Sequence, residues 1–129
     1  MSDLKLFLFP KACSRVVLVA LEHVGADYET AFVDLTRGEQ LGSDYRSLNP
    51  RGKVPALLTE QGLLSENGAI QFYLHARFPD AGLLPKVSNE WERAQQLADL
   101  FWVSSVWHPT VRAIKMPMRW TTGDTGPVG

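Results

Sequence analysis

Residues 48–58 read Leu-Asn-Pro-Arg-Gly-Lys-Val-Pro-Ala-Leu-Leu, and after a turn at residues 59–62 residues 63–70 read Leu-Leu-Ser-Glu-Asn-Gly-Ala-Ile. The first segment places a Val-Pro step directly before an apolar strand. An X-Pro bond turns cis at a cost of only about 0.5–1 kcal/mol, so Pro55 can bend the chain and leave the backbone N–H and C=O of Val54 facing outward. The segment therefore predicts an edge at which a second extended backbone can pair.

The second segment places polar residues at the start of a helix. We expect this helix to begin near Asn67, where the first backbone N–H groups and the partial positive charge of the helix favour a carboxylate. A carboxylate site beside a strand-pairing site suits the end of a small anionic peptide. The two segments together therefore predict one binding site for such a peptide.

Both segments resemble the glutathione transferase superfamily. Residues 49–57 are similar to its Asn-Pro-x-Gly-x-Val-Pro motif, and residues 66–74 are similar to its Glu-Ser-x-Ala-Ile motif, with Asn67 in the place of the serine. The two motifs occur in order at a spacing that fits a hairpin, and the resemblance extends from about Leu4 to Pro85. It implies a protein that uses glutathione as its co-substrate.

The hydrophobic pattern predicts a strand–helix–strand unit followed by a hairpin and a helix. Ser14 is a candidate N-cap, and Gly25 is a stop signal. This is the βαβ-ββα order of a thioredoxin-like α/β domain. The expected strands are residues 4–9, 28–34, 56–59 and 63–65, and the expected helices are residues 15–24, 43–46 and 67–78.

The chain then changes character. Prolines and a glycine between residues 79 and 85 predict a linker, and apolar residues recur at helical spacing from Ser88 to Trp107. The resemblance implies that an all-helical domain begins here, and that this chain carries only part of it. We predict a thioredoxin-like domain at residues 1–79, a linker at 80–87 and a partial helical domain at 88–129, with a loosely ordered tail at 121–129.

Composition narrows the possible partners. Thirteen basic residues against fourteen acidic ones give no electrostatic surface for nucleic acid, and the longest apolar run is far below the roughly 20 residues that span a bilayer. A single cysteine and the lack of a signal-like N-terminus suggest a reducing cytoplasm. The three histidines have no ligand spacing, so we expect no metal site. The resemblance also implies that the protein is a homodimer, that it acts on a small electrophilic substrate and that it has a role in detoxification.

Cys13 and Ser14 are the candidate catalytic residues. Cys13 lies between the first strand and the first helix, where helix N–H groups stabilise a thiolate, although a lone cysteine is more commonly a small buried hydrophobe. Residues 10–14, Pro-Lys-Ala-Cys-Ser, also resemble the turn of bacterial beta-class glutathione transferases, whose cysteine faces the glutathione sulfur. Ser14 is the rival, because its hydroxyl can cap the helix or donate to the glutathione thiolate. Activation by tyrosine is disfavoured, because the end of the first strand holds only phenylalanines.

The resemblance also assigns the glutathione-binding residues. They are Lys53, Val54, Pro55, Glu66 and Asn67. Val54 pairs with the cysteinyl backbone, Glu66 contacts the amino group, Asn67 contacts the glutamyl carboxylate, and Lys53 or Arg51 meets the glycine carboxylate.

Three functions fit these residues. The first is a glutathione transferase that conjugates glutathione to electrophiles. The second is a non-catalytic interaction module with the same fold, which the Asn67 departure and the short helical part favour. The third is a one-cysteine, glutathione-dependent thiol reductase, because Cys13 has no second cysteine beside it.

Overall fold

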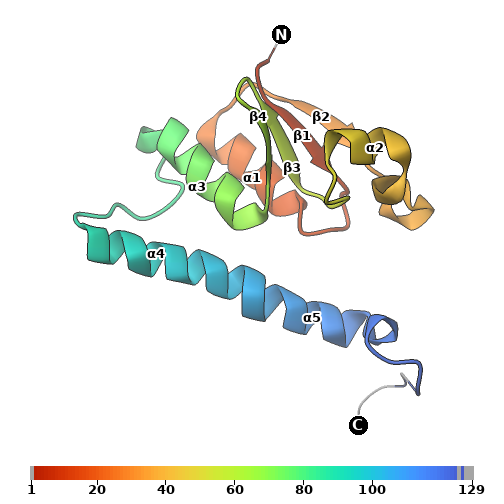
Figure 1. Ribbon diagram of the computed structural model, residues 1–129. Helices are drawn as coiled ribbons and strands as arrows, with labels where there is room; N and C mark the ends of the chain where they lie inside the picture. The colour runs from red at the N-terminus through yellow and green to blue at the C-terminus, as the bar shows by residue number, and fades with distance from the viewer. Residues whose placement is uncertain (1, 125, 127–129) are drawn as a thin grey trace. The chain divides into compact units, whose positions relative to one another are not determined.

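The computed structural model describes residues 2–124 and 126, and the chain divides into two compact units, Met1–Lys86 and Val87–Gly129. Figure 1 shows a sheet with helices in the first unit and a long helical rod in the second. The expectation of a loose tail falls partly on residues 125 and 127–129, which lie outside the described residues.

The first unit is built on a four-stranded mixed sheet. Its order is β2-β1-β3-β4, with β1 and β2 parallel and the other two pairs antiparallel. The strands are β1 (Lys5–Leu8), β2 (Glu29–Phe32), β3 (Ala56–Thr59) and β4 (Gly62–Ser65). The predicted thioredoxin-like order of strands is confirmed, and the ends of the strands differ from the prediction by one or two residues.

Helices α1 (Arg15–Val24) and α3 (Asn67–Arg77) share one hydrophobic core with the sheet. Leu4, Leu6 and Leu8 are at most 1% exposed, because alternate residues of a strand point to the same face. Burying each such side chain contributes about 1.5–3 kcal/mol. The other core residues are Val17, Ala20, Leu21, Leu57, Ile70 and Leu74.

The segment between β2 and β3 is more ordered than the sequence predicts. Two 3₁₀ turns, Leu35–Arg37 and Glu39–Leu41, precede α2 (Ser43–Leu48). Side chains hold them: the Asp34 carboxylate accepts a hydrogen bond from the backbone N–H of Thr36 (2.9 Å), and the Glu39 carboxylate accepts one from the N–H of Asp34 (2.7 Å). The predicted helix at residues 43–46 is present as α2, and the 3₁₀ turns before it depend on these side-chain hydrogen bonds.

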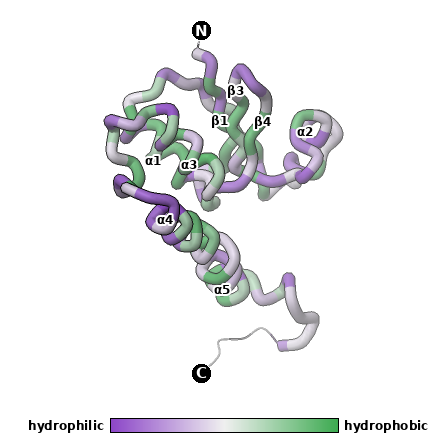
Figure 2. The backbone as a smooth tube through the Cα atoms, turned by 60° about the vertical axis from the view of Figure 1, so that its left-hand side comes forward, coloured by the Kyte–Doolittle hydropathy of each residue, from purple (hydrophilic) through white to green (hydrophobic). Residues whose placement is uncertain are grey.

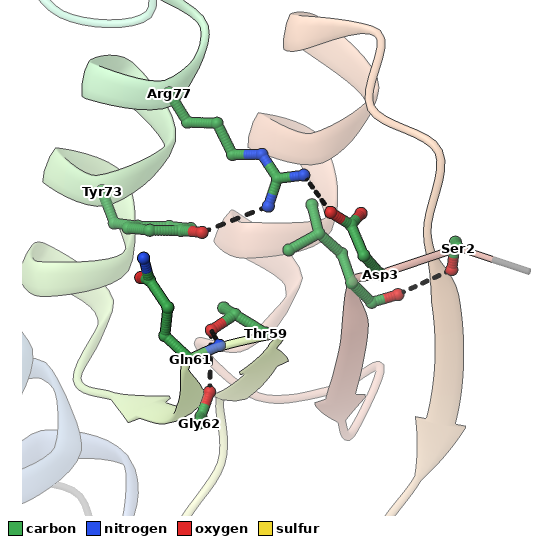
Figure 3. A network of polar contacts seen from close by, with 8 residues as sticks. Ser2, Asp3, Thr59, Gln61, Gly62, Tyr73 and Arg77 are labelled. Carbon is green, nitrogen blue, oxygen red and sulfur yellow. Dashed lines mark hydrogen bonds and ion pairs between the residues drawn. The ribbon is translucent and has the colours of Figure 1, made fainter.

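Polar contacts tie the N-terminal segment to α3 (Figure 3). The guanidinium of Arg77 donates to the carboxylate of Asp3 and to the hydroxyl of Tyr73 (3.1 Å). In the β3–β4 turn, the hydroxyl of Thr59 donates to the carbonyl of Gly62 (2.9 Å). The hydrogen bond to Arg77 lowers the pKa of Asp3, since it favours the ionised carboxylate.

The second unit is a helix with an interruption. Helix α4 (Glu90–Trp102) begins at Asn89, whose side chain accepts a hydrogen bond from the N–H of Glu92 (3.0 Å). A π-helical segment, Val103–Trp107, separates α4 from α5 (His108–Lys115), and a 3₁₀ turn follows at Pro117–Arg119. Figure 2 shows a hydrophilic start of α4 that gives way to apolar residues. The aromatic side chains of this helix are exposed: Trp91, Phe101, Trp102 and Trp107.

Candidate functional site

The turn between β1 and α1 is closed by Ser14. Its buried hydroxyl donates to the carbonyl of Phe9 (2.9 Å) and accepts from the N–H of Phe9 (3.0 Å). Ser14 occupies the predicted N-cap position of α1, but its side chain makes no cap hydrogen bond. The physical reason is that residue 14 already has helical dihedral angles, φ −60° and ψ −20°, and its side chain turns back to the strand.

Cys13 is half-buried in this turn and lies beside Val54, at the predicted bend. Its sulfur is 3.9 Å from the carbonyl oxygen of Val54, and the side-chain amide of Asn67 donates to the Cys13 carbonyl over 3.1 Å. The fold thus brings Cys13, Val54 and Asn67 together, although they are separated by 41 and 54 positions along the chain.

The bend at Val54 has the predicted form. The Val54–Pro55 peptide bond is cis, and the ladders that pair β3 with β1 and β4 end at Ala56. Val54 therefore lies just beyond the sheet, with its carbonyl oxygen near the Cys13 sulfur.

Two residues that the sequence analysis did not single out stabilise the backbone next to Val54, at the carbonyl of Lys53. The hydroxyl of Tyr45 (2.6 Å) and the amide of Asn49 (2.9 Å) both donate to the carbonyl of Lys53, while the Lys53 side chain is exposed. Burial raises the pKa of the Tyr45 phenol, so the hydroxyl keeps the proton that it donates. Asn49 carries a sequence signal because it opens the Asn-Pro-x-Gly motif, but nothing near Tyr45 in the sequence indicates its role.

Gly52 is required for the same turn. Its φ is +60°, and a Cβ at this position would lie 2.8 Å from the backbone oxygen of Gln40. Only glycine fits such a backbone without a shift of its neighbour.

Glu66 and Arg51 face each other at the start of α3. Glu66 has φ +76°, the one positive φ outside glycine among the described residues, and its carboxylate is 3.6 Å from the Arg51 guanidinium. The resemblance implies Lys53, and after it Arg51, as contacts of the glycine carboxylate. The structure places Arg51 beside the residue predicted to contact the amino group.

Asn67 is the first residue of α3 rather than its cap. Its Nδ2 group bonds to Cys13, whereas its Oδ1 atom is buried and has no hydrogen-bond partner in the part of the chain that the structure describes. The amide thus links α3 to the Cys13 turn.

Residues 2–124 and 126 lack the features of two other kinds of site. No group of three His, Cys, Asp or Glu side chains among them is arranged to hold a metal ion. No helix that they form is both long and apolar enough to cross a membrane.

The strand order and the cis-proline edge beside the Cys13 turn define a thioredoxin-like domain. A comparison with protein families matches residues 2–76 to the glutathione S-transferase N-terminal domain. This match covers more than half of the chain, which therefore belongs to the glutathione S-transferase family.

Individual glutathione transferases are also similar to this chain in sequence and in structure. Glutathione S-transferase GstA from Escherichia coli O157:H7 is 42% identical over 88 residues, which are 67% of this chain and 44% of that protein. A glutathione transferase homologue from Sulfitobacter, solved with bound glutathione, has a TM-score of 0.81 at 32% identity and covers 97% of this chain and 60% of that chain. A bacterial beta-class enzyme from Sphingomonas chungbukensis has a TM-score of 0.76 at 35% identity, over 95% of this chain and 59% of that one.

The matches differ from this chain in length. The chain spans between 37% and 44% of the length of four curated relatives. The activity and substrates of those longer proteins are therefore only proposed for this chain.

Proposed function

We propose that this chain binds glutathione and acts as a glutathione transferase that conjugates it to small electrophiles. The observation that carries the proposal is the convergence of Cys13, the backbone of Val54 and the start of α3, joined by the Asn67–Cys13 hydrogen bond. Relatives solved with glutathione support the same choice of ligand.

The geometry supports an extended pose of the tripeptide. The backbone of Val54 pairs with the cysteinyl residue next to the cis Pro55, and the first N–H groups of α3 with Asn67 receive the glutamyl carboxylate. Glu66 receives the ammonium group, and the exposed Lys53 side chain is available to the glycine carboxylate.

In this pose the glutathione sulfur lies near Cys13. The glutathione thiol releases its proton to water, its thiolate attacks the electrophile, a carbon–sulfur bond forms and the leaving group departs with its bonding electrons. The positive end of the α1 helix dipole stabilises negative charge at this turn. Ser14 supports the turn rather than the thiolate, because its hydroxyl is buried and bonded at both ends to Phe9.

Other parts of the proposal come from the sequence and the family. We propose a homodimer in the cytoplasm with a role in detoxification, and a thioredoxin-like domain at residues 1–79 with a linker at 80–87 and a helical part at 88–129. The reducing environment suggested by a single cysteine supports the location.

The test is binding of glutathione to the whole chain, measured by calorimetry and by retention on immobilised glutathione. Glu66→Ala should lower the affinity, whereas Glu60→Ala should not, because Glu60 is an exposed carboxylate in the turn at the far end of β3. Absence of binding by the parent chain would reject the proposal. Binding without conjugation of a reactive aryl halide would favour the interaction module instead.

A further inference from the structure

Two histidines, neither of which the proposed function uses, hold the segment that follows α3. His75 lies in the last turn of α3, and His23 lies in the last turn of α1. The N–H of Leu84 donates to Nδ1 of His75 (3.3 Å), and Nε2 of His23 donates to the carbonyl of Ala81 (2.9 Å). Imidazole rings from two different helices therefore attach this segment to the first unit.

The segment also makes an apolar contact between these two hydrogen bonds. The chain turns at Gly82, whose φ is +66°, and the side chain of Leu83 packs against the hydrophobic core. Contacts at Ala81, Leu83 and Leu84 thus fix successive parts of the segment on the first unit. They set the direction in which the chain leaves that unit after Lys86.

The two histidine contacts respond differently to a proton. A ring nitrogen that accepts a hydrogen bond carries no proton, so His75 is neutral in this contact and its proton is on Nε2. A second proton would bind at Nδ1, and the ring would then point an N–H at the N–H of Leu84. His23 donates from Nε2, which keeps its proton in the charged ring as well. Protonation therefore removes the first contact and preserves the second.

We propose that His75 is a pH-sensitive attachment point for residues 82–86. A histidine side chain changes charge between about pH 5 and 8. As the pH falls, a proton from water binds to Nδ1, the hydrogen bond from Leu84 breaks, and the Leu84 N–H turns to water. The attached state contains the neutral ring, so a higher pH favours it. This inference is independent of glutathione binding.

Release is confined to the second half of the segment. His23 keeps its hydrogen bond to Ala81 across the same pH range, so the turn at Pro79–Ala81 stays in place. Residues 82–86 lose their polar attachment, and the first unit no longer fixes the direction in which the chain leaves it. The charge of one imidazole thereby controls the freedom of the connection to the second unit.

No ion pair competes for His75 among the described residues. Nearby charged groups have partners of their own: Glu22 of α1 accepts from Tyr28, and Arg77 of α3 donates to Asp3. β4, which also packs on α3, carries no charged side chain. Protonation of His75 is therefore coupled to the Leu84 hydrogen bond rather than to a fixed charge. The other charged or titratable groups on the elements around it are Arg15 and His23 of α1 and Asp80 and Lys86 of the segment.

Nuclear magnetic resonance of the whole chain between about pH 5 and 8 tests the proposal. The ring signals of His75 report its charge, and hydrogen exchange of the Leu84 amide reports the bond. After correction for the intrinsic pH dependence of exchange, the protection of the Leu84 amide should fall about two- to tenfold as His75 becomes charged. Both changes should have the same midpoint.

Four variants define the group responsible. His75→Asn places an amide oxygen near the position of Nδ1 and does not titrate, so the protection of Leu84 should stay high over the whole range. His75→Leu should lose that protection at every pH. His23→Gln keeps an N–H donor near Ala81, and His108→Gln changes a histidine on α5, so both should leave the Leu84 step unchanged.

Three results would overturn the proposal. The first is an unchanged Leu84 amide in a protein whose His75 ring has become charged. The second is a pH step that survives in His75→Asn, because another group would then be titrating. The third is an equal loss of protection at Leu6 in the sheet, which would assign the change to unfolding of the first unit.

Discussion

The side-chain amide of Asn67 donates to the backbone carbonyl of Cys13 over 3.1 Å, and so joins the first residue of α3 to the turn that precedes α1. These two elements carry the glutamyl part and the sulfur part of the proposed glutathione site. The hydrogen bond makes the position of the cysteine depend on the residue that replaces the serine usual at this point of the family motif.

Replacing Asn67 by serine should therefore loosen the Cys13 turn. Serine is too short to reach the carbonyl, so the free energy of unfolding should fall by about 0.5–1.5 kcal/mol and the thiol of Cys13 should react faster with a disulfide reagent. Urea unfolding and thiol kinetics measure the two effects. Asn89→Ser is the matched control, because serine also caps a helix well. Equal stability and reactivity of Asn67→Ser and the parent chain would show that the hydrogen bond contributes nothing.

Substitution of Ser14 should lower the stability of the protein, whereas substitution of Cys13 should lower its activity. Ser14→Ala leaves the N–H of Phe9 without its partner and removes one of two hydrogen bonds to the Phe9 carbonyl, which also accepts from the N–H of Ala12 (3.0 Å), so it should cost about 1–3 kcal/mol of stability. Its glutathione affinity, measured well below the unfolding temperature, should remain near that of the parent. Cys13→Ala should keep the stability and lose conjugation. A stable Ser14→Ala protein that cannot activate glutathione would instead assign the activating role to the serine.

Two glycines with similar backbone conformations allow the steric cost of an added Cβ to be measured separately from the cost of a positive φ. Gly52 and Gly38 have φ of +60° and +71°, but an added Cβ meets the Gln40 carbonyl at 2.8 Å only at Gly52, and nothing lies within 4 Å at Gly38. Gly38→Ala should cost about 1–2 kcal/mol, the ordinary penalty of a left-handed conformation. Gly52→Ala should cost clearly more and also weaken glutathione binding, because the Val54 edge moves with it. Equal unfolding midpoints for the two variants in urea would contradict this.

The phenol of Tyr28 supplies a test at high pH. Its hydroxyl donates to the carboxylate of Glu22, which raises the pKa of Tyr28 from 10.0 to about 12. Because the folded state holds the proton more tightly, the stabilisation is fully present below pH 10 and is lost as the pH rises toward 12. An ultraviolet titration of tyrosinate should show this late step, which should disappear in Tyr28→Phe and move to lower pH in Glu22→Ala. A Tyr28 signal that titrates at its ordinary value would refute the hydrogen bond.

The local signals of the chain predicted most of the fold. Alternating leucines at positions 4, 6 and 8 define a strand with one buried face, and Gly25 ends α1 in the left-handed conformation expected of a stop. The polar stretch after β2 was predicted less well, because its 3₁₀ turns depend on hydrogen bonds from Asp34 and Glu39 rather than on hydrophobic periodicity.

The sequence by itself determined which chemical groups the candidate site contains, and that the bond before Pro55 can adopt the cis form that it has. These are local properties of a motif, set by residue type and by the nearest neighbours along the chain. Only the tertiary structure decided that Ser14 turns inward to Phe9, that Arg51 stands beside Glu66, and that Tyr45 supports Lys53. The direction of a side chain depends on which distant backbone groups the fold places within its reach. A local motif does not encode that direction.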